Sequence, residues 1–311
     1  MRSDFSHQPV LLAEVLEGLD IQSNGMYVDG TFGRGGHAGA ILGQLGSAGK
    51  LLAMDKDPEA VRSAELQFGS DSRFEIEHGA FTMLGQLIEQ RHLKGRVNGL
   101  LLDLGVSSPQ LDDPLRGFSF SDDGPLDMRM DPAAGLSAAQ WLAEAGEPVI
   151  SDVLKTFGEE RFARRIARKI VQARKEEPVC TTRQLADLIA AAVPVRERHK
   201  HPATRSFLAL RIFINRELDD LQAVLEQVPD ALAKHGRLAV ISFHSLEDRI
   251  VKRFIRREYR GEQPPPDLPL SGMEHRPRMR PVGKAIRPGA AEVARNPRAR
   301  SAVLRVAECL Q

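Results

Sequence analysis

The sequence predicts an α/β fold in which one parallel sheet is interrupted by a helical insert. Residues 1–104 alternate short apolar runs with amphipathic stretches, which is the rhythm of βαβ units. A long polar loop and then helical periodicity replace that rhythm, and strand patterns return only in the last third. The most economical arrangement is therefore a sheet domain built from both ends of the chain.

The first third supplies four predicted strands and three predicted helices. The strands are Met26–Asp29, Lys50–Asp55, Phe74–His78 and Gly99–Leu104, and the helices are Gly36–Leu45, Pro58–Gln67 and Met83–Arg91. Asp57 followed by Pro58 is a favourable helix start, because the acid caps the helix and proline fits its first turn.

The middle of the chain predicts helices after a long loop. Gly105–Gly135 is rich in Asp, Gly, Pro and Ser, and loops of this length are usually functional or disordered. Helical periodicity then covers Ala138–Leu218. Its longest amphipathic piece, Glu159–Lys175, has Phe162, Ile166 and Ile170 on one face and Arg161, Arg164, Arg165, Arg168 and Lys169 on the other.

The last third completes the predicted sheet. Its strands are Arg237–Phe243, Met279–Ile286 and Ser301–Ala307, with a helix over Leu246–Tyr259 and a Pro-rich break at Gln263–Pro269. We therefore predict a sheet domain at 1–112 and 213–311, and a helical insert at 113–212.

Charge is segregated along the chain, although its total is only +1. The net charge is −11 over 1–158, +6 over 159–205, −3 over 206–248 and +9 over 249–311. Two basic segments beside an acidic body suggest a polyanion such as nucleic acid as the partner, although basic segments also occur as solvated faces.

Composition excludes several classes of protein. The chain has 311 residues, 42% of them hydrophobic, so its core is large enough that Cys180 and Cys309 need not form a disulfide. No apolar run reaches the roughly 20 residues of a membrane span, and the start of the chain lacks a signal-peptide layout. Metal-binding motifs such as HExxH are absent from the sequence. We expect a cytoplasmic protein with no membrane or metal partner.

A glycine-rich turn follows the first strand and reads Asp29-Gly30-Thr31-Phe32-Gly33-Arg34-Gly35-Gly36-His37-Ala38. Closely spaced glycines between a strand and a helix let a ligand approach the backbone. One candidate ligand is NAD, because Gly33–Ala38 fits GxGxxA and Asp55 lies 20 residues after Gly35. The other is S-adenosylmethionine, because an acid at Asp29 repels a pyrophosphate but holds an ammonium group. Asp55 suits the ribose hydroxyls of either ligand.

Three later segments add candidate residues. Phe81 follows the third strand, where its ring either meets an adenine or packs in the core. Ser108-Pro109 matches the first two positions of the Asp/Asn/Ser-Pro-Pro-aromatic loop of amine-directed methyltransferases, and an ordinary turn explains it as well. Ser245 is expected to cap a helix, with Asp248 completing a capping box.

The sequence resembles the RsmH (MraW) family of small-subunit ribosomal RNA cytosine-N4 methyltransferases. The motifs that carry the resemblance occur in order at Asp29–His37, Leu101–Gln110, Arg116–Phe120, Gly124–Met130, His201–Arg205 and Ser242–Asp248. The resemblance extends from His7 to about Ala307. It implies a Rossmann-like, class I methyltransferase sheet domain with an all-helical insert.

The resemblance also implies an activity and its residues. S-adenosylmethionine would methylate the exocyclic N4 amine of a cytidine in the decoding region of 16S ribosomal RNA. Cofactor contacts are expected at Gly35, Gly36, His37, Asp55, Phe81, Asp103 and Gln110, and Ser108 is the candidate contact to the amine. The partner would be small-subunit ribosomal RNA, free or in the assembled subunit. The oligomeric state stays open, a dimer being one option.

The insert is then the expected RNA-recognition domain. Candidate contacts to RNA are Arg161–Lys169, Arg205 and Arg276–Arg300. Two other functions remain open on the residues alone: an NAD-dependent oxidoreductase, which fits GxGxxA with Asp55, and a non-catalytic RNA-binding protein whose glycine turn has lost its ligand.

Overall fold

The computed structural model describes residues 9–195, 201–261 and 276–311 of the chain. The chain divides into two compact units, one formed by 1–105 with 218–311 and the other by 106–217. Within the described ranges, no helix is both long and apolar enough to cross a membrane.

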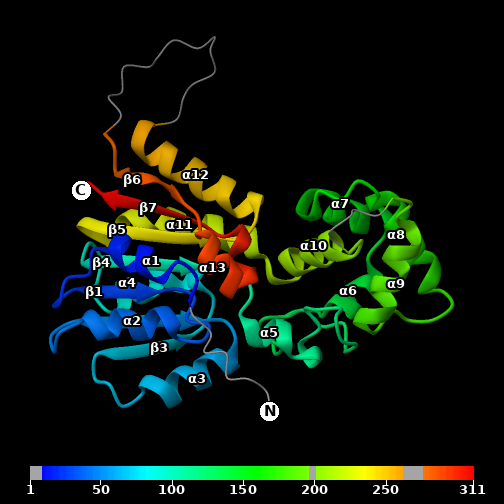
Figure 1. The fold of residues 1–311 in the computed structure, drawn as a ribbon, viewed down its shortest axis with the longest axis horizontal. Helices are drawn as coiled ribbons and strands as arrows, with labels where there is room; N and C mark the ends of the chain where they lie inside the picture. Colours follow the sequence, from blue (N-terminus) through cyan, green and yellow to red (C-terminus); the bar gives the residue numbers. More distant parts are fainter. Residues whose placement is uncertain (1–8, 196–200, 262–275) are drawn as a thin grey trace, which may run out of the picture. The chain divides into compact units, whose positions relative to one another are not determined.

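The first unit is a seven-stranded sheet with helices on both faces (Figure 1). Its N-terminal elements are α1 (Leu12–Leu19), β1 (Met26–Asp29), α2 (Gly36–Gln44), β2 (Lys50–Asp55), α3 (Pro58–Phe68), β3 (Phe74–His78), η1 (Phe81–Met83), α4 (Leu84–Gln90) and β4 (Val97–Asp103). Its C-terminal elements are α11 (Glu217–Ala231), β5 (Leu232–Ser242), α12 (Ser245–Arg260), β6 (Met279–Ile286), α13 (Ala290–Arg295), η3 (Pro297–Ser301) and β7 (Val303–Cys309).

The strand order is β3-β2-β1-β4-β5-β7-β6, which is the order of a doubly wound sheet with the last strand inserted. Strands β1 to β5 pair in parallel, and β7 runs antiparallel to both β5 and β6. The expected α/β class is confirmed. The expectation of a purely parallel sheet is wrong at β7.

Each face of the sheet buries its own apolar cluster. Alternate residues of a strand point to opposite faces, so Val28 and Leu52 pack with α4, α11 and α12, whereas Tyr27 and Leu51 pack with α1, α2 and α3. Because both faces are covered, the central strands are almost continuously apolar, as in the Leu100–Leu102 run of β4.

Most predicted strands match the structure, and the differences have local causes. Strands β1, β2, β3 and β6 have the predicted bounds. Strand β5 begins at Leu232, before the predicted Arg237, because Leu232 pairs with Val97 beyond a register irregularity. The exposed Lys234 and His235 lie between Leu232 and Arg237, and they interrupt the apolar pattern by which the strand was predicted.

The second unit is helical. It contains α5 (Ser108–Asp112), η2 (Pro114–Arg116), α6 (Ala138–Glu144), α7 (Glu147–Gly158), α8 (Ala163–Ala173), α9 (Thr182–Ala192) and α10 (Thr204–Asn215). The predicted loop Gly105–Gly135 therefore begins with two short helices. Helix α8 starts later than the predicted Glu159, because Glu159 has a left-handed backbone that ends α7.

Two of the motifs in this unit, Arg116–Phe120 and Gly124–Met130, are held together by hydrogen bonds that fix the long loop. The buried Arg116 donates hydrogen bonds to the carbonyl oxygens of Arg129 and Met130. From α10, Asn215 accepts from the backbone of Met130 and donates to the carbonyl of Met128. These side chains satisfy backbone groups that a loop cannot pair by itself, so both motifs have a structural role.

Candidate cofactor site

The carboxyl ends of β1, β2 and β4 each carry an aspartate. Asp29, Asp55 and Asp103 are the last residues of these strands, and β1 lies between the other two in the sheet. Carboxyl ends of parallel strands meet at one edge of the sheet, where ligands of open α/β folds bind. We call this edge, with the glycine turn that follows β1, the carboxylate edge.

The glycine turn is fixed by packing around its backbone. Gly35 caps α2 with φ of 76°, and a side chain there would collide with the rings of Phe32 and Phe68. A side chain on Gly36, the first residue of α2, would collide with Pro9. Any cofactor contact by these two residues therefore uses their backbone atoms at the start of α2.

Asp55 organises the turn as well as ending β2. Its Oδ2 accepts a hydrogen bond of 2.8 Å from the backbone N–H of Gly33, and its Oδ1 accepts one of 2.8 Å from Asp57. A carboxylate oxygen has a second lone pair, so both oxygens can still accept from a ligand hydroxyl. Asp57 itself caps α3 by accepting from Glu59, as predicted.

Thr31 links the ends of β1 and β4. Its Oγ1 accepts a hydrogen bond of 2.6 Å from the backbone N–H of Asp103 and lies 3.4 Å from Oδ1 of Asp29. The same Asp29 oxygen accepts from the backbone N–H of Thr31. Sequence reasoning did not single out Thr31, although Asp29-x-Thr31 is the spacing of an Asx turn.

His37 lies beside the carboxylate of Asp103. Its Nε2 is 3.1 Å from the carbonyl oxygen of Val10, which fixes a proton on Nε2, and its Nδ1 is 3.6 Å from Oδ2 of Asp103. The His37 side chain is buried. Helix α2 and the end of β4 thus bring together two of the predicted cofactor residues.

Burial raises the pKa of all three carboxyl groups. The pKa of Asp29 rises to about 7, and the neighbouring charge of Asp55 adds to the effect of burial. Burial raises the pKa of Asp55 to about 6. The pKa of Asp103 rises to about 8 through burial and through repulsion from Asp29 and Glu247. A cationic ligand would relieve this repulsion, whereas a phosphate would increase it.

Two carboxylate oxygens of this edge have unused hydrogen-bonding capacity. Oδ2 of Asp29 and Oδ1 of Asp103 are buried and bond to no other residue in the described part of the chain. Buried polar atoms normally have partners, so these two oxygens point to a missing donor. The chemistry of the donor set therefore fits a ligand with a positive charge and hydroxyl groups.

Phe81 borders the same turn. It begins η1 directly after β3, and its Cβ lies 3.3 Å from where a side chain on Gly30 would start. Phe81 is only partly buried, and it packs against the cluster that covers one face of the sheet. The contact of Phe81 with the adenine therefore stays a prediction, and a role in the core is equally compatible with this position.

The segment after β5 differs from the expectation. His244 rather than Ser245 is the N-cap of α12, and Glu247 occupies the N3 position. Oε2 of Glu247 accepts from the backbone of Phe243 and His244. Asp248 instead forms a bidentate pair with Arg305 on β7. The predicted Ser245–Asp248 capping box is therefore wrong by one residue.

Ser108 and Gln110 belong to the second unit. Ser108 is the first residue of α5, and the buried Gln110 side chain accepts from the backbone N–H of Ser107, which caps the helix. Ser107-x-x-Gln110 is a capping-box spacing that the sequence already offered. Their contacts to the amine and to the cofactor remain predictions.

Comparisons with known proteins identify the family. A profile of the MraW methylase family matches residues 4–310. The chain belongs to this family. It is 61% identical over 306 residues to "Ribosomal RNA small subunit methyltransferase H" of Thioalkalivibrio sulfidiphilus, covering 98% of each protein. The resemblance seen in the sequence is thereby confirmed.

Solved structures of low identity were also matched. An rRNA methylase from Streptococcus thermophilus is 12% identical with a TM-score of 0.41, the match covering 97% of this chain and 93% of that one. A SAM-dependent O-methyltransferase from Thermotoga maritima is 13% identical with a TM-score of 0.42, covering 98% and 68%.

S-adenosylmethionine is the cofactor of this methylase. It carries a sulfonium, an ammonium group and ribose hydroxyls, and it has no phosphate. The three carboxyl groups of the carboxylate edge fit these groups, whereas the pyrophosphate of NAD would meet the buried Asp29. The interpretation of GxGxxA as an NAD motif is therefore wrong for this chain.

Proposed function

We propose that this protein transfers a methyl group from S-adenosylmethionine to the N4 amine of a cytidine in the decoding region of small-subunit ribosomal RNA, in the cytoplasm. The observation that carries the proposal is the carboxylate edge, built for a cationic cofactor, in a chain 61% identical to a small-subunit ribosomal RNA methyltransferase. The target atom follows from the family resemblance of the sequence.

Residues at the carboxylate edge would hold the cofactor. The unpartnered oxygens of Asp29 and Asp103 are suited to the ammonium group, and Asp55 is suited to the ribose hydroxyls. The backbone of Gly35, Gly36 and His37 begins α2 beside them, and Phe81 offers its ring to the adenine. Gln110 is a further proposed contact to the cofactor.

When bound, the cofactor supplies an electrophilic methyl group on a positively charged sulfur. The protein contributes mainly by positioning the two reactants, because the amine must lie in line with the methyl group at near-attack distance. The lone pair of an exocyclic amine is delocalised into its ring, so an acceptor for its hydrogens favours attack. We assign that contact to Ser108, and the methylated amine then releases its proton to water.

Basic side chains would hold the RNA phosphates. On α8, Arg164, Arg165, Arg168 and Lys169 are exposed, while Ile166 and Ile170 on the opposite face are buried. Arg161 is also exposed, and half-buried Arg205 donates to the carbonyl oxygen of Glu159. These residues support the insert, 113–212, as the RNA-recognition domain, with Arg276–Arg300 as a further contact.

Methyl transfer to defined RNA tests the proposal. The purified protein is incubated with tritiated S-adenosylmethionine and either naked 16S ribosomal RNA or small subunits from cells that lack the enzyme. Nucleosides from the digested RNA are then separated and weighed by mass spectrometry. We expect label in N4-methylcytidine from one fragment of the decoding region, with large-subunit RNA as the unlabelled control.

Each other outcome has a defined meaning. Label on a different atom of cytidine would refute the N4 target and keep the RNA methyltransferase. RNA binding without any transfer to either substrate would favour the non-catalytic RNA-binding alternative. Comparing naked RNA with the subunit also decides which of them is the substrate.

A further inference from the structure

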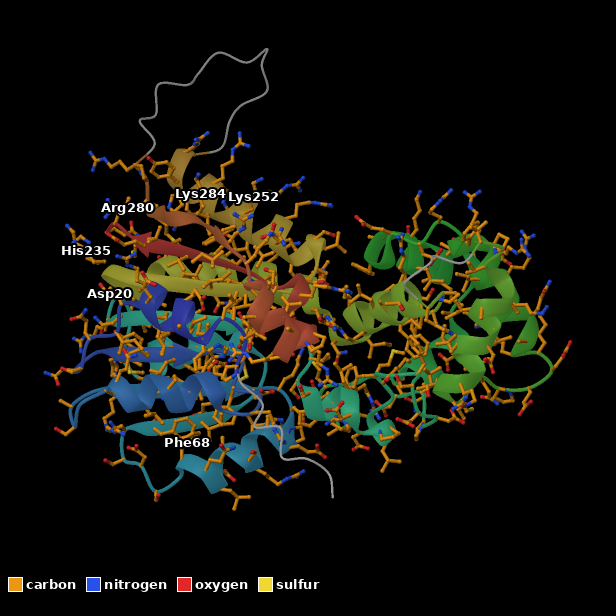
Figure 2. All side chains as sticks on the ribbon, viewed as in Figure 1. Asp20, Phe68, His235, Lys252, Arg280 and Lys284 are labelled. Atoms are coloured by element: carbon orange, nitrogen blue, oxygen red, sulfur yellow. The ribbon has the colours of Figure 1, made fainter. Side chains whose placement is uncertain are left out.

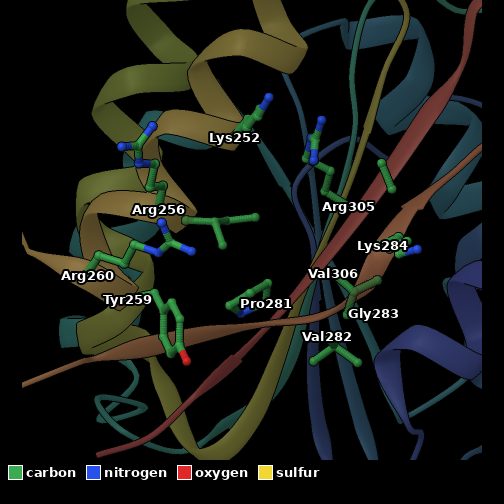
Figure 3. Close-up of a pocket in the computed structure, with 12 residues that line it drawn as sticks. Lys252, Arg256, Tyr259, Arg260, Pro281, Val282, Gly283, Lys284, Arg305 and Val306 are labelled. Carbon is green, nitrogen blue, oxygen red and sulfur yellow. The ribbon is translucent and has the colours of Figure 1, made fainter.

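A groove lies on the first unit between α12 and the edge strand β6 (Figure 3). Its volume is about 400 Å³, and β7 forms its floor. Apolar atoms of Ile255, Val282 and Val306 line it. Strands β5 and β7 separate β6 from β4, so the groove is distinct from the carboxylate edge.

Positive charge surrounds the groove. Its cationic lining residues are Lys252, Arg256, Arg260, Lys284 and Arg305, and no acidic residue lines it. Figure 2 shows Lys252 on α12 near Lys284 on β6. Within the described residues, no carboxylate lies within 4.0 Å of the amino groups of these two lysines.

The carboxylates near the groove are already paired. Asp248 binds Arg305 at 2.7 Å, Glu258 binds Arg278 at 2.7 Å, and Glu308 binds Arg280 at 2.9 Å. These pairs neutralise Asp248, Glu258 and Glu308, and they leave Lys252 and Lys284 to attract an anion. The groove therefore has a net positive field, and opposite charge raises the local concentration of a polyanion.

Tyr259 gives the groove an aromatic surface. It is one of two tyrosines in the chain, and the residue is 42% exposed. Its ring lies beside Pro281 of β6, below the guanidinium group of Arg260 (Figure 3). An exposed ring flanked by cations is the arrangement on which single-stranded nucleic acid stacks its bases.

We propose that this groove binds a single-stranded segment of the RNA substrate, with a base on Tyr259 and its phosphates on Lys252, Arg260 and Lys284. The inference rests on the proposed function, since it adds an anchoring site for the same RNA. RNA is favoured over a lipid surface because the apolar residues of α12, Val251, Phe254 and Ile255, are buried against the sheet. A membrane-binding helix needs such residues exposed.

Binding of a short fluorescent oligouridylate tests the groove without methyl transfer. We expect Tyr259→Ala to weaken binding roughly tenfold through lost stacking, and Tyr259→Phe to bind like the unaltered protein. The double variant Lys252→Glu, Lys284→Glu should weaken binding and lower the salt slope by about 0.7 for each lysine. Lys234→Glu is the control for a single charge reversal outside the groove, because Lys234 is exposed near the start of β5 and does not line the groove.

Further measurements separate this inference from the proposed function. In methyl transfer to 16S ribosomal RNA, the groove variants should raise KM and keep kcat, with unchanged S-adenosylmethionine affinity by calorimetry. Normal methylation by the unaltered protein, with groove variants that bind oligouridylate like Lys234→Glu, would overturn the groove and leave the function standing. No methylation by the unaltered protein would instead refute the function.

Two further experiments identify the ligand that binds in the groove. Photocrosslinking with a 4-thiouridine oligonucleotide should attach RNA to the peptide that contains Tyr259, and attachment elsewhere only would overturn the inference. Vesicles of phosphatidylcholine and phosphatidylserine are the alternative ligand. If the groove variants lose vesicle binding while their RNA affinity is unaltered, the groove is a lipid-binding surface and the proposal is wrong.

Discussion

The carboxylate edge and the α12–β6 groove belong to the same sheet and have opposite electrostatics. At the edge, burial raises the pKa of Asp29, Asp55 and Asp103, and repulsion from a neighbouring carboxylate adds to each shift. In the groove, Lys252 and Lys284 are exposed around an apolar floor. The near-neutral total charge of the chain thus conceals one surface for a cation and one for a polyanion.

The two surfaces also differ in how strongly each charge acts. Charges buried at the edge interact through a low effective dielectric, so a single cationic ligand changes their ionisation. The exposed cations of the groove are screened by salt, so several of them must act together. We therefore expect single substitutions to have large effects at the edge and smaller, salt-dependent effects on the basic surfaces.

The largest effect is expected for Asp55→Ala. This change removes the acceptors for Gly33 and Asp57 together with the proposed acceptor for the ribose hydroxyls. Hydrogen bonds to a charged group contribute roughly 1.5–3 kcal/mol each, so S-adenosylmethionine affinity should fall about 100-fold or more by calorimetry.

Asp57→Ala is the matched control for that prediction. Asp57 is a buried acid in the same loop, but its Oδ1 caps α3 by accepting from Glu59. Loss of the cap should lower the free energy of unfolding by about 1 kcal/mol and leave cofactor affinity intact. Unchanged affinity in Asp55→Ala would remove Asp55 from the cofactor site.

The next effect is a pH dependence of cofactor binding. The pKa values of Asp29 and Asp103, about 7 and about 8 in the ligand-free protein, leave both groups partly protonated near neutrality. A bound cation favours the ionised forms, so binding should release protons between about pH 6 and pH 8. Affinity should rise with pH, by up to about tenfold per pH unit for each proton released.

Calorimetry in buffers of different ionisation enthalpy measures that proton release. Asp103→Asn should reduce it, and S-adenosylhomocysteine, which lacks the sulfonium charge, should cause less of it. The stability of the ligand-free protein should change in the opposite direction. A raised folded-state pKa stabilises at low pH, and this stability is lost as pH rises from about 4 through 8. Proton uptake on binding would contradict the assignment.

The smallest effect is expected on α8. Replacing Arg164, Arg165 and Arg168 with Glu should weaken RNA binding several-fold and flatten its salt dependence, because the three side chains are exposed and no core contact is lost. Cofactor affinity should stay the same. Filter binding over a salt series measures the slope, and an unaltered slope would make this face a solvated surface without a ligand.

The sequence predicted the strands better than it predicted their directions. Apolar runs bounded by turns located β1 and β2, because residues buried on both faces leave a continuous signal, and the alternation of Phe74–His78 located the edge strand β3. Nothing in Val303–Cys309 encodes the antiparallel direction of β7, since strand alternation is the same in either direction. The start of β5 was missed because polar residues interrupt its pattern.

The candidate site was predictable where it depends on strand ends. Asp29, Asp55 and Asp103 were readable as acids that follow apolar runs, and parallel topology gathers such residues at one edge. The roles of Thr31 and Glu247 could not be predicted, because they depend on how the chain folds after β1 and after β5. The α12–β6 groove could not be predicted, because α12 and β6 meet only when β7 is inserted between β5 and β6.

The position of β7 has a consequence for how the chain acquires its structure. Residues 106–217 are contiguous, so that unit forms from contacts within one stretch of sequence. The sheet instead needs β4 to pair with β5 across that whole stretch, and Val303–Cys309 must then enter between two strands. Contacts of such long sequence separation form slowly. During synthesis, the helical unit can fold early, whereas the sheet cannot be completed before Val303–Cys309 has been made.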